Sequence, residues 1–178
     1  VNPAFKEDSI LNGAVDNATG TAALLEIAEA FVSLPERQNR SVLFLAVTCE
    51  EQGLLGSKFY AENPIFPLSK TAAVINMDVL NITGKTKDMT IIGFGNSGLD
   101  DIAIAVLQKQ GRYANPDPAP EKGLYFRSDH LSFAVAGVPS IYLSKGIDDV
   151  EHGKEWGLAE SEKWIMENYH KPTDNYEP

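Results

Sequence analysis

Short apolar runs alternate with segments of helical periodicity along this chain. Residues 41–48 (SVLFLAVT) and 71–77 (TAAVINM) are continuous and rich in β-branched side chains, which is typical of strands buried on both faces. Residues 89–92 and 140–143 fit shorter strands. Helices are predicted over residues 19–34, 54–62, 97–110, 129–136 and 155–169. The alternation predicts an α/β fold, a three-layer αβα sandwich around a mainly parallel mixed sheet.

The pattern predicts a single domain over residues 1–178. No repeat or internal linker divides the chain, and a chain of this length buries about 70% of its unfolded surface. Residues 1–18, the proline-rich 115–122 and 170–178 are predicted to be irregular.

The charge balance excludes several kinds of partner. Asp and Glu number 25 against 15 Lys and Arg, a net charge of −10, and no basic cluster is present, so we expect no nucleic-acid partner. The longest apolar run, residues 42–47, is far shorter than the roughly 20 residues that cross a bilayer, so no membrane span is expected. A single cysteine, Cys49, excludes a disulfide framework and a thiolate zinc cluster.

Acidic residues follow the two longest apolar runs. Glu50 and Glu51 come just after residues 41–48, and Asp78 directly follows residues 71–77. Asp16 precedes the first predicted helix, and His170 follows the last. Open parallel sheets place their ligands outside the carboxyl ends of the strands, so these side chains could converge on one edge.

Bound cations would make such a cluster stable. Two unit charges about 4 Å apart repel by roughly 4 kcal/mol at an effective dielectric near 20. Mixed carboxylate and imidazole ligands suit zinc. In an extended segment, one glutamate of the adjacent pair can bind metal while the other faces substrate and acts as a base. The alternative is that the pair lies in a solvated turn.

Five segments resemble the two-zinc aminopeptidase family, metallopeptidase family twenty-eight, which includes glutamate carboxypeptidase II, glutaminyl cyclase and the transferrin-receptor ectodomain. They are, in order, GAVDNATGTAALLEIAEAF, SVLFLAVTCEEQGLLGSKFYAE, INMDVLN, RSDHLSFAVAGVP and YHKPTDNY. The resemblance covers almost the whole chain. It implies a zinc-exopeptidase-like fold, an exported (periplasmic or extracellular) hydrolase, peptide substrates and two zinc ions per intact domain.

The resemblance also implies roles for single residues. Asp16 matches the carboxylate that bridges the two zincs, Glu51 and His170 match ligands of one zinc, and Asp78 matches a ligand of the other. Glu50 matches the general base that activates a metal-bridging water. Tyr125 resembles a tyrosine that steadies the tetrahedral oxyanion in some members.

One family ligand has no match in this sequence. The family pattern has a histidine some twenty residues before the bridging aspartate, whereas the first histidine here is His130. We therefore expect a catalytic domain trimmed at both ends that completes the site of Asp16, Glu51 and His170 but not the site of Asp78. Such a chain would hold one zinc or none and hydrolyse poorly.

Other functions remain open at this point. The family resemblance also allows a glutaminyl cyclase-like acyltransferase or a non-catalytic, receptor-like binding domain. GFGNSG (93–98) satisfies a dinucleotide-binding pattern, but a glycine-rich turn suffices to explain it. Cys49 is expected to be a small buried core residue rather than a nucleophile paired with His130, which is expected to be structural.

Overall fold

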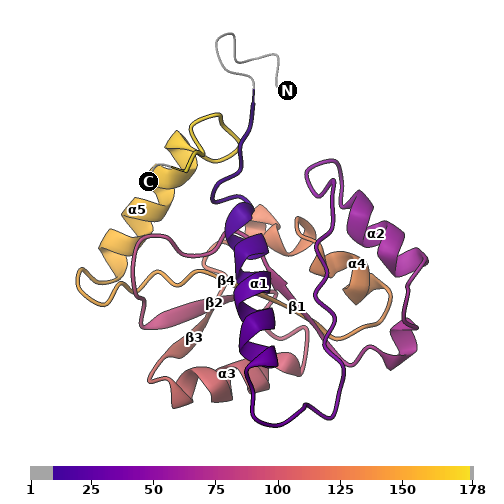
Figure 1. Ribbon diagram of the computed structural model, residues 1–178. Helices are drawn as coiled ribbons and strands as arrows, with labels where there is room; N and C mark the ends of the chain where they lie inside the picture. The colour runs from indigo at the N-terminus through magenta and orange to yellow at the C-terminus, as the bar shows by residue number, and fades with distance from the viewer. Residues whose placement is uncertain (1–9, 177–178) are drawn as a thin grey trace.

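A mixed four-stranded sheet forms the centre of the protein, seen here in a computed structural model that describes residues 10–176 (Figure 1). The strand order is β1-β4-β2-β3. β1 (Val74–Met77) and β4 (Ser140–Ser144) are parallel, as are β2 (Asp88–Ile92) and β3 (Tyr113–Pro116), and β4 runs antiparallel to β2. The predicted fold class, with a mainly parallel mixed sheet, is confirmed.

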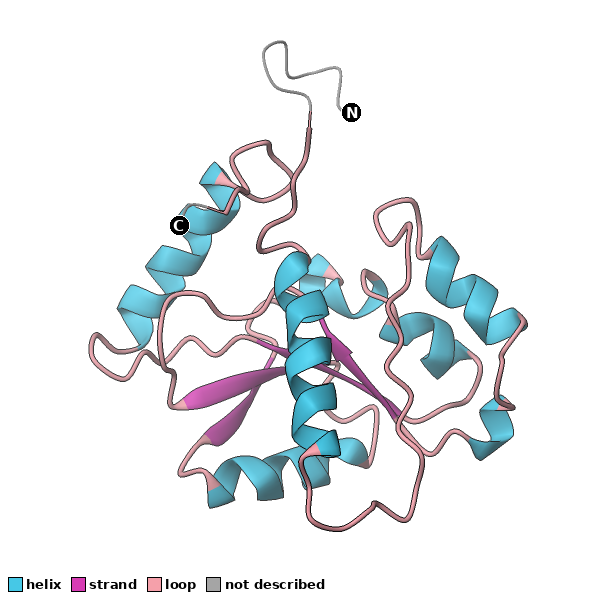
Figure 2. Cartoon of the chain, viewed as in Figure 1, coloured by secondary structure: helices cyan, strands magenta, loops and turns pink. Residues whose placement is uncertain are grey.

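Helices lie on both sides of this sheet (Figure 2). They are α1 (Ala18–Val32), α2 (Leu55–Glu62), α3 (Leu99–Lys109), α4 (His130–Val135) and α5 (Lys154–Glu167), with short 3₁₀ turns η1 (Leu68–Lys70), η2 (Pro120–Lys122) and η3 (Leu124–Phe126). α3 contacts β2, β3 and β4; α4 contacts β1 and β4; and α2 packs on α4. The five α-helices have bounds close to those that the sequence predicts. Among the described residues, no helix is both long and apolar enough to span a membrane.

The alternation of side chains along β1 separates the two faces of the sheet. Val74 packs with Phe133 of α4 and with Tyr60 of α2 in the main buried cluster. Ile75 points to the other face, where it lines a groove of about 680 Å³ together with Ile27 of α1. α1 therefore covers the face opposite α4, as Figure 1 shows.

The strand predicted over residues 41–48 is wrong. This segment has no strand pairing, and Val42 and Leu43 are 46% and 49% exposed. Only part of it reaches the core, where Leu45 packs against the cluster around Phe133. A doubly buried strand needs neighbouring strands on its edges, and none of the described strands pairs with this segment.

The predicted loop over residues 115–122 also needs correction. Its first two residues belong to β3, whose last residue is Pro116, and its last three form η2. A proline is tolerated there because β3 lies at the edge of the sheet and leaves one side of its backbone unpaired. Residues 10–17 contain no strand, as predicted, whereas the irregular structure predicted for 1–9 and 177–178 lies outside the described residues.

Candidate metal centre

Asn17 fixes the loop that carries Asp16. Its side-chain oxygen accepts the Gly20 amide at 2.9 Å as the N-cap of α1, and its amide group donates to the Met77 carbonyl at 3.1 Å. A Cβ on Gly20 would lie 2.6 Å from that carbonyl, so this contact requires glycine. The start of α1 is thereby held against the end of β1, which brings Asp16 to the same place as Asp78.

A tight turn before α2 carries Glu50 and Glu51. The amides of Gly53 and Leu54 donate to the Glu50 carbonyl at 3.0 and 2.8 Å. The Gly56 amide donates to the Thr48 carbonyl at 3.0 Å, and a Cβ on Gly56 would lie 2.3 Å from that oxygen. The sequence EEQGLLG therefore folds back at this point and presents both carboxylates at one edge of the fold.

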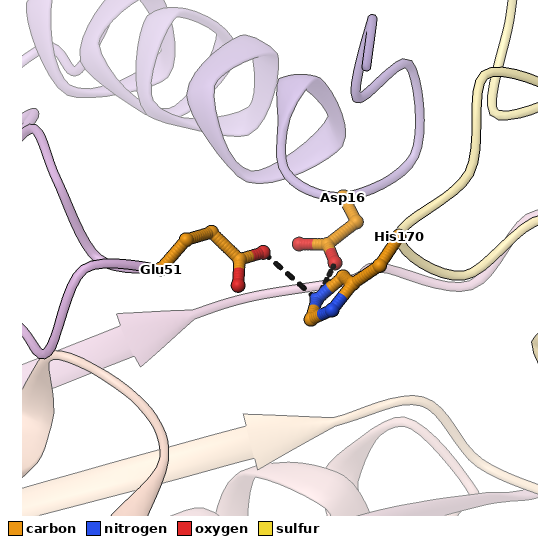
Figure 3. Close-up of side chains that lie close together, drawn as sticks. All are labelled: Asp16, Glu51 and His170. Carbon is orange, nitrogen blue, oxygen red and sulfur yellow. Dashed lines mark ion pairs between the residues drawn. The ribbon is translucent and has the colours of Figure 1, made fainter. Parts of the chain in front are cut away.

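Asp16, Glu51 and His170 converge from three distant parts of the chain (Figure 3). Nε2 of His170 lies 2.8 Å from Oε1 of Glu51 and 3.3 Å from Oδ2 of Asp16. One donor atom from each residue lies within 4.8 Å of the others. Asp16 is mostly buried, whereas Glu51 and His170 are 53% and 43% exposed, so the group opens to solvent.

This donor set fits zinc. Zinc takes carboxylate oxygen and imidazole nitrogen at about 2.0–2.2 Å, so two atoms bound to one zinc are separated by at most twice that distance. The three donor atoms here all lie within 4.8 Å of one another, so small side-chain movements would bring them onto one ion. Three protein ligands would leave a fourth position for water or substrate, which is the pattern of catalytic rather than structural zinc. No second group of three such donors lies together in residues 10–176.

Asp78 lies beside this group, and Ser128 holds its carboxylate in place. The Ser128 hydroxyl donates to Asp78 Oδ2 at 2.7 Å and accepts from the Asn76 side chain at 2.7 Å. Burial raises the pKa of Asp78, and the bond from Ser128 opposes this shift. Asp78 does not join the three-donor group, so its predicted role as a zinc ligand stays a prediction.

The carboxylates face a common cavity of about 430 Å³, here named the acidic cavity. Its acidic lining residues are Asp16, Glu50, Glu51, Asp78 and Asp129, and no lysine or arginine is among the described residues that line it. Asp129 was not predicted to belong to the site, although it stands in the RSDHLSF segment. Burial raises its pKa, and Oδ1 has no hydrogen-bond partner.

Burial and crowding of like charges shift the acids of this cavity. Burial raises the pKa of Asp16 to about 6, and the charges of Asp78 and Glu51 add to the shift. Burial raises the pKa of Glu50 to about 8, and the neighbouring carboxylates, with Asp78 first, add to it. A cation bound here would relieve this repulsion, and Glu50 is a carboxyl group suited to proton transfer near neutral pH.

Backbone strain concentrates at the same place. Four non-glycine residues in the described chain have positive φ, and three of them, Cys49 (58°), Val79 (51°) and His170 (56°), adjoin or belong to the site. Such conformations cost about 1–3 kcal/mol each and tend to cluster at functional sites. The β-branched Val79 is the least compatible with this region.

Tyr125 and His130 are not among the residues that line the acidic cavity. The Tyr125 ring packs edge-to-face on His130, with the centroids 4.8 Å apart. His130 is fully buried, as its structural interpretation requires, and burial lowers its pKa to about 4. The oxyanion role of Tyr125 stays a prediction.

Two other sequence features have local explanations. In the glycine-rich turn, the Gly95 amide donates to the Asp100 carboxylate at 2.6 Å, which occupies a donor that a phosphate would need. A Cβ on Gly93 would overlap the Tyr125 ring, so packing accounts for that glycine. Cys49 is exposed, so its prediction as a buried core residue is wrong, because the turn that presents Glu50 carries it out of the core.

An open site of two carboxylates and one imidazole, with a further glutamate beside it, is the arrangement that metal-dependent hydrolases use. The comparisons with known proteins agree. The profile of Peptidase family M28 matches residues 3–178, and the chain belongs to this family.

Several relatives extend the similarity. Aminopeptidase YwaD of Bacillus subtilis (strain 168) is 26% identical over 93% of this chain and 33% of that protein. Leupeptin-inactivating enzyme 1 of Streptomyces exfoliatus is 31% identical over 88% of this chain and 34% of that protein. The structure of BSAP, a zinc aminopeptidase from Bacillus subtilis, superposes with a TM-score of 0.65 at 25% identity, covering 92% of this chain and 36% of that one. The chain thus spans about a third of the length of these relatives.

Proposed function

We propose that this chain carries the catalytic centre of a zinc-dependent exopeptidase, an aminopeptidase. The observation that carries the proposal is the convergence of Asp16, Glu51 and His170 within 4.8 Å at the cavity that Glu50 also lines. Zinc is supported by the donor types and by the relative whose structure is described as a zinc aminopeptidase.

The charge of the acidic cavity favours a substrate with a free amino end. Five carboxylates line it and no lysine or arginine does so in the described chain, so a cationic ammonium group is attracted and a terminal carboxylate is repelled. With one divalent cation bound, the five carboxylates still outweigh its charge, so the net charge of the cavity stays negative. This preference supports amino-terminal over carboxy-terminal hydrolysis.

The residues divide the chemical work between them. Asp16, Glu51 and His170 would hold the cation, with Asp78 available beside them. When bound, zinc would polarise the scissile carbonyl and make a water molecule more acidic. Glu50 takes the proton from the attacking water at its carboxylate and delivers it to the nitrogen of the leaving amine.

Zinc content and substrate choice test the proposal in the full-length protein. We expect bound zinc and release of the first residue from aminoacyl substrates. Ring closure of N-terminal glutaminyl peptides with loss of ammonia would indicate a cyclase instead. Failure to turn over either substrate when zinc is bound would favour a receptor-like binding domain, and failure to bind zinc would refute the metal site.

A further inference from the structure

Asp174 ties the loop that carries Asp16 to the turn that carries His170. Its Oδ1 accepts the Val15 amide at 2.8 Å, and its Oδ2 accepts the Asp16 amide at 3.0 Å. Its backbone carbonyl accepts the Ala14 amide at 3.2 Å. Three consecutive amides near one end of the described chain therefore donate to a single residue near the other end.

The contact is buried and specific. Asp174 is only 4% exposed, so its carboxylate has lost most of its water and depends on these amides. The amides of Val15 and Asp16 precede the N-cap of α1, so the helix itself supplies no acceptor for them. A carboxylate offers an oxygen to each amide, whereas a carboxamide offers only one.

The same residue is rigidly connected to His170. The Lys171 amide donates to the Asn168 carbonyl at 2.9 Å, and the Asp174 amide donates to the Lys171 carbonyl at 3.1 Å. The first of these turns contains His170, whose φ is 56°, and the second leads directly from it to Asp174. A displacement of Asp174 would therefore move the imidazole relative to Asp16.

We propose that Asp174 is a positioning residue of the metal centre, which sets the separation of Asp16 and His170 by clamping their two backbone segments together. The inference rests on the proposed function, since it takes these two residues as metal ligands. A clamp of this kind lets two ligands far apart in sequence act as one preformed site, so that less ordering accompanies metal binding.

The test measures zinc affinity, by competition with a chelating dye, in full-length wild-type protein and in Asp174→Asn. The variant keeps the size of the side chain but loses its charge and one acceptor. We expect its affinity for zinc to fall about 10- to 100-fold, as for other residues that orient metal ligands. The loss should persist near 1 M salt, where the Debye length is about 3 Å, because it comes from geometry rather than from distant charge.

Asp88→Asn is the matched control. Asp88 is fully buried and accepts the amides of Ile147 and Asp148, so it clamps two backbone segments in the same way, but it does not line the acidic cavity. We expect this variant to lower the thermal midpoint of the metal-free protein and to leave zinc affinity unchanged.

Three results would overturn the inference while leaving the metal site intact. They are wild-type zinc affinity in Asp174→Asn, a loss that high salt abolishes, and an equal loss in Asp88→Asn. If the wild-type protein itself bound no zinc, the proposed function would fail together with the inference.

Discussion

Nε2 of His170 lies 2.8 Å from Oε1 of Glu51, although the two residues come from turns far apart in the sequence. The same nitrogen is 3.3 Å from Asp16. A single imidazole nitrogen cannot satisfy two carboxylates as well as a divalent cation can, because each carboxylate has further lone pairs to share. The arrangement is therefore better suited to metal binding than to a simple ion pair.

Removal of a ligand should remove the metal. We expect Asp16→Ala and His170→Ala to lose bound zinc, because each deletes one of the three donors that converge there. Metal analysis after dialysis measures this. His152→Ala serves as the control, since its imidazole bonds to Asp149 at 2.9 Å outside the site and its loss should leave zinc content unchanged. Full zinc content in His170→Ala would contradict the assignment.

Glu50→Gln should separate metal binding from catalysis. The glutamine keeps the shape of the side chain but cannot accept a proton, so we expect zinc to be retained and the rate of peptide hydrolysis to fall on the order of 10²–10⁴-fold. Steady-state assays of the full-length enzyme, with zinc content measured on the same sample, provide the check. Wild-type turnover in this variant would exclude Glu50 as the base.

The sequence predicted the local elements better than their pairing. Periodicity located the helices and three strands, and the end of β1 located Asp78 at the edge of the sheet. Periodicity could not reveal that residues 41–48 find no partner strand, because pairing depends on which other segments compete for the sheet edges. Pro116 likewise argued for a loop, although an edge strand tolerates it.

The residues that support the site could not be identified from short sequence patterns. Asp174 bonds to an amide 158 residues away, a relationship that no short pattern contains. Its only signal was its place in YHKPTD, four positions after His170. Asp129 looked like the start of α4, and its role in the acidic cavity depends on how α4 sits against the turn of Glu50.

The metal-free protein should become less stable as pH rises from about 6.5 to 8. Below this range the buried His130, whose pKa is lowered to about 4, contributes the opposite trend. The folded state raises the pKa of Asp16 to about 6 and of Glu50 to about 8, above their unfolded values, so these two groups bind more protons in the folded state than in the unfolded chain. Thermal midpoints in a chelator should therefore fall with pH in this range, and Glu50→Gln should flatten the trend. Added zinc should stabilise the protein most at the alkaline end, where the carboxylates are charged. A midpoint that rises with pH over this range in the chelator would contradict the charge crowding.

Ser128→Ala should destabilise the protein by about 1–3 kcal/mol, the cost of leaving buried polar groups without a partner. Ser128 is 2% exposed, and its removal deprives Asp78 of a donor and Asn76 of an acceptor. The bond favours the charged form of Asp78, so the loss in free energy of unfolding should grow as pH rises through the titration of that carboxyl. Urea unfolding at acid and neutral pH measures the difference.

Ser140→Ala is the matched control for this prediction. Its buried hydroxyl donates to the Val138 carbonyl, which does not titrate, so the loss in free energy of unfolding should be independent of pH. Equal pH dependence in the two variants would show that Ser128 does not support the charge of Asp78.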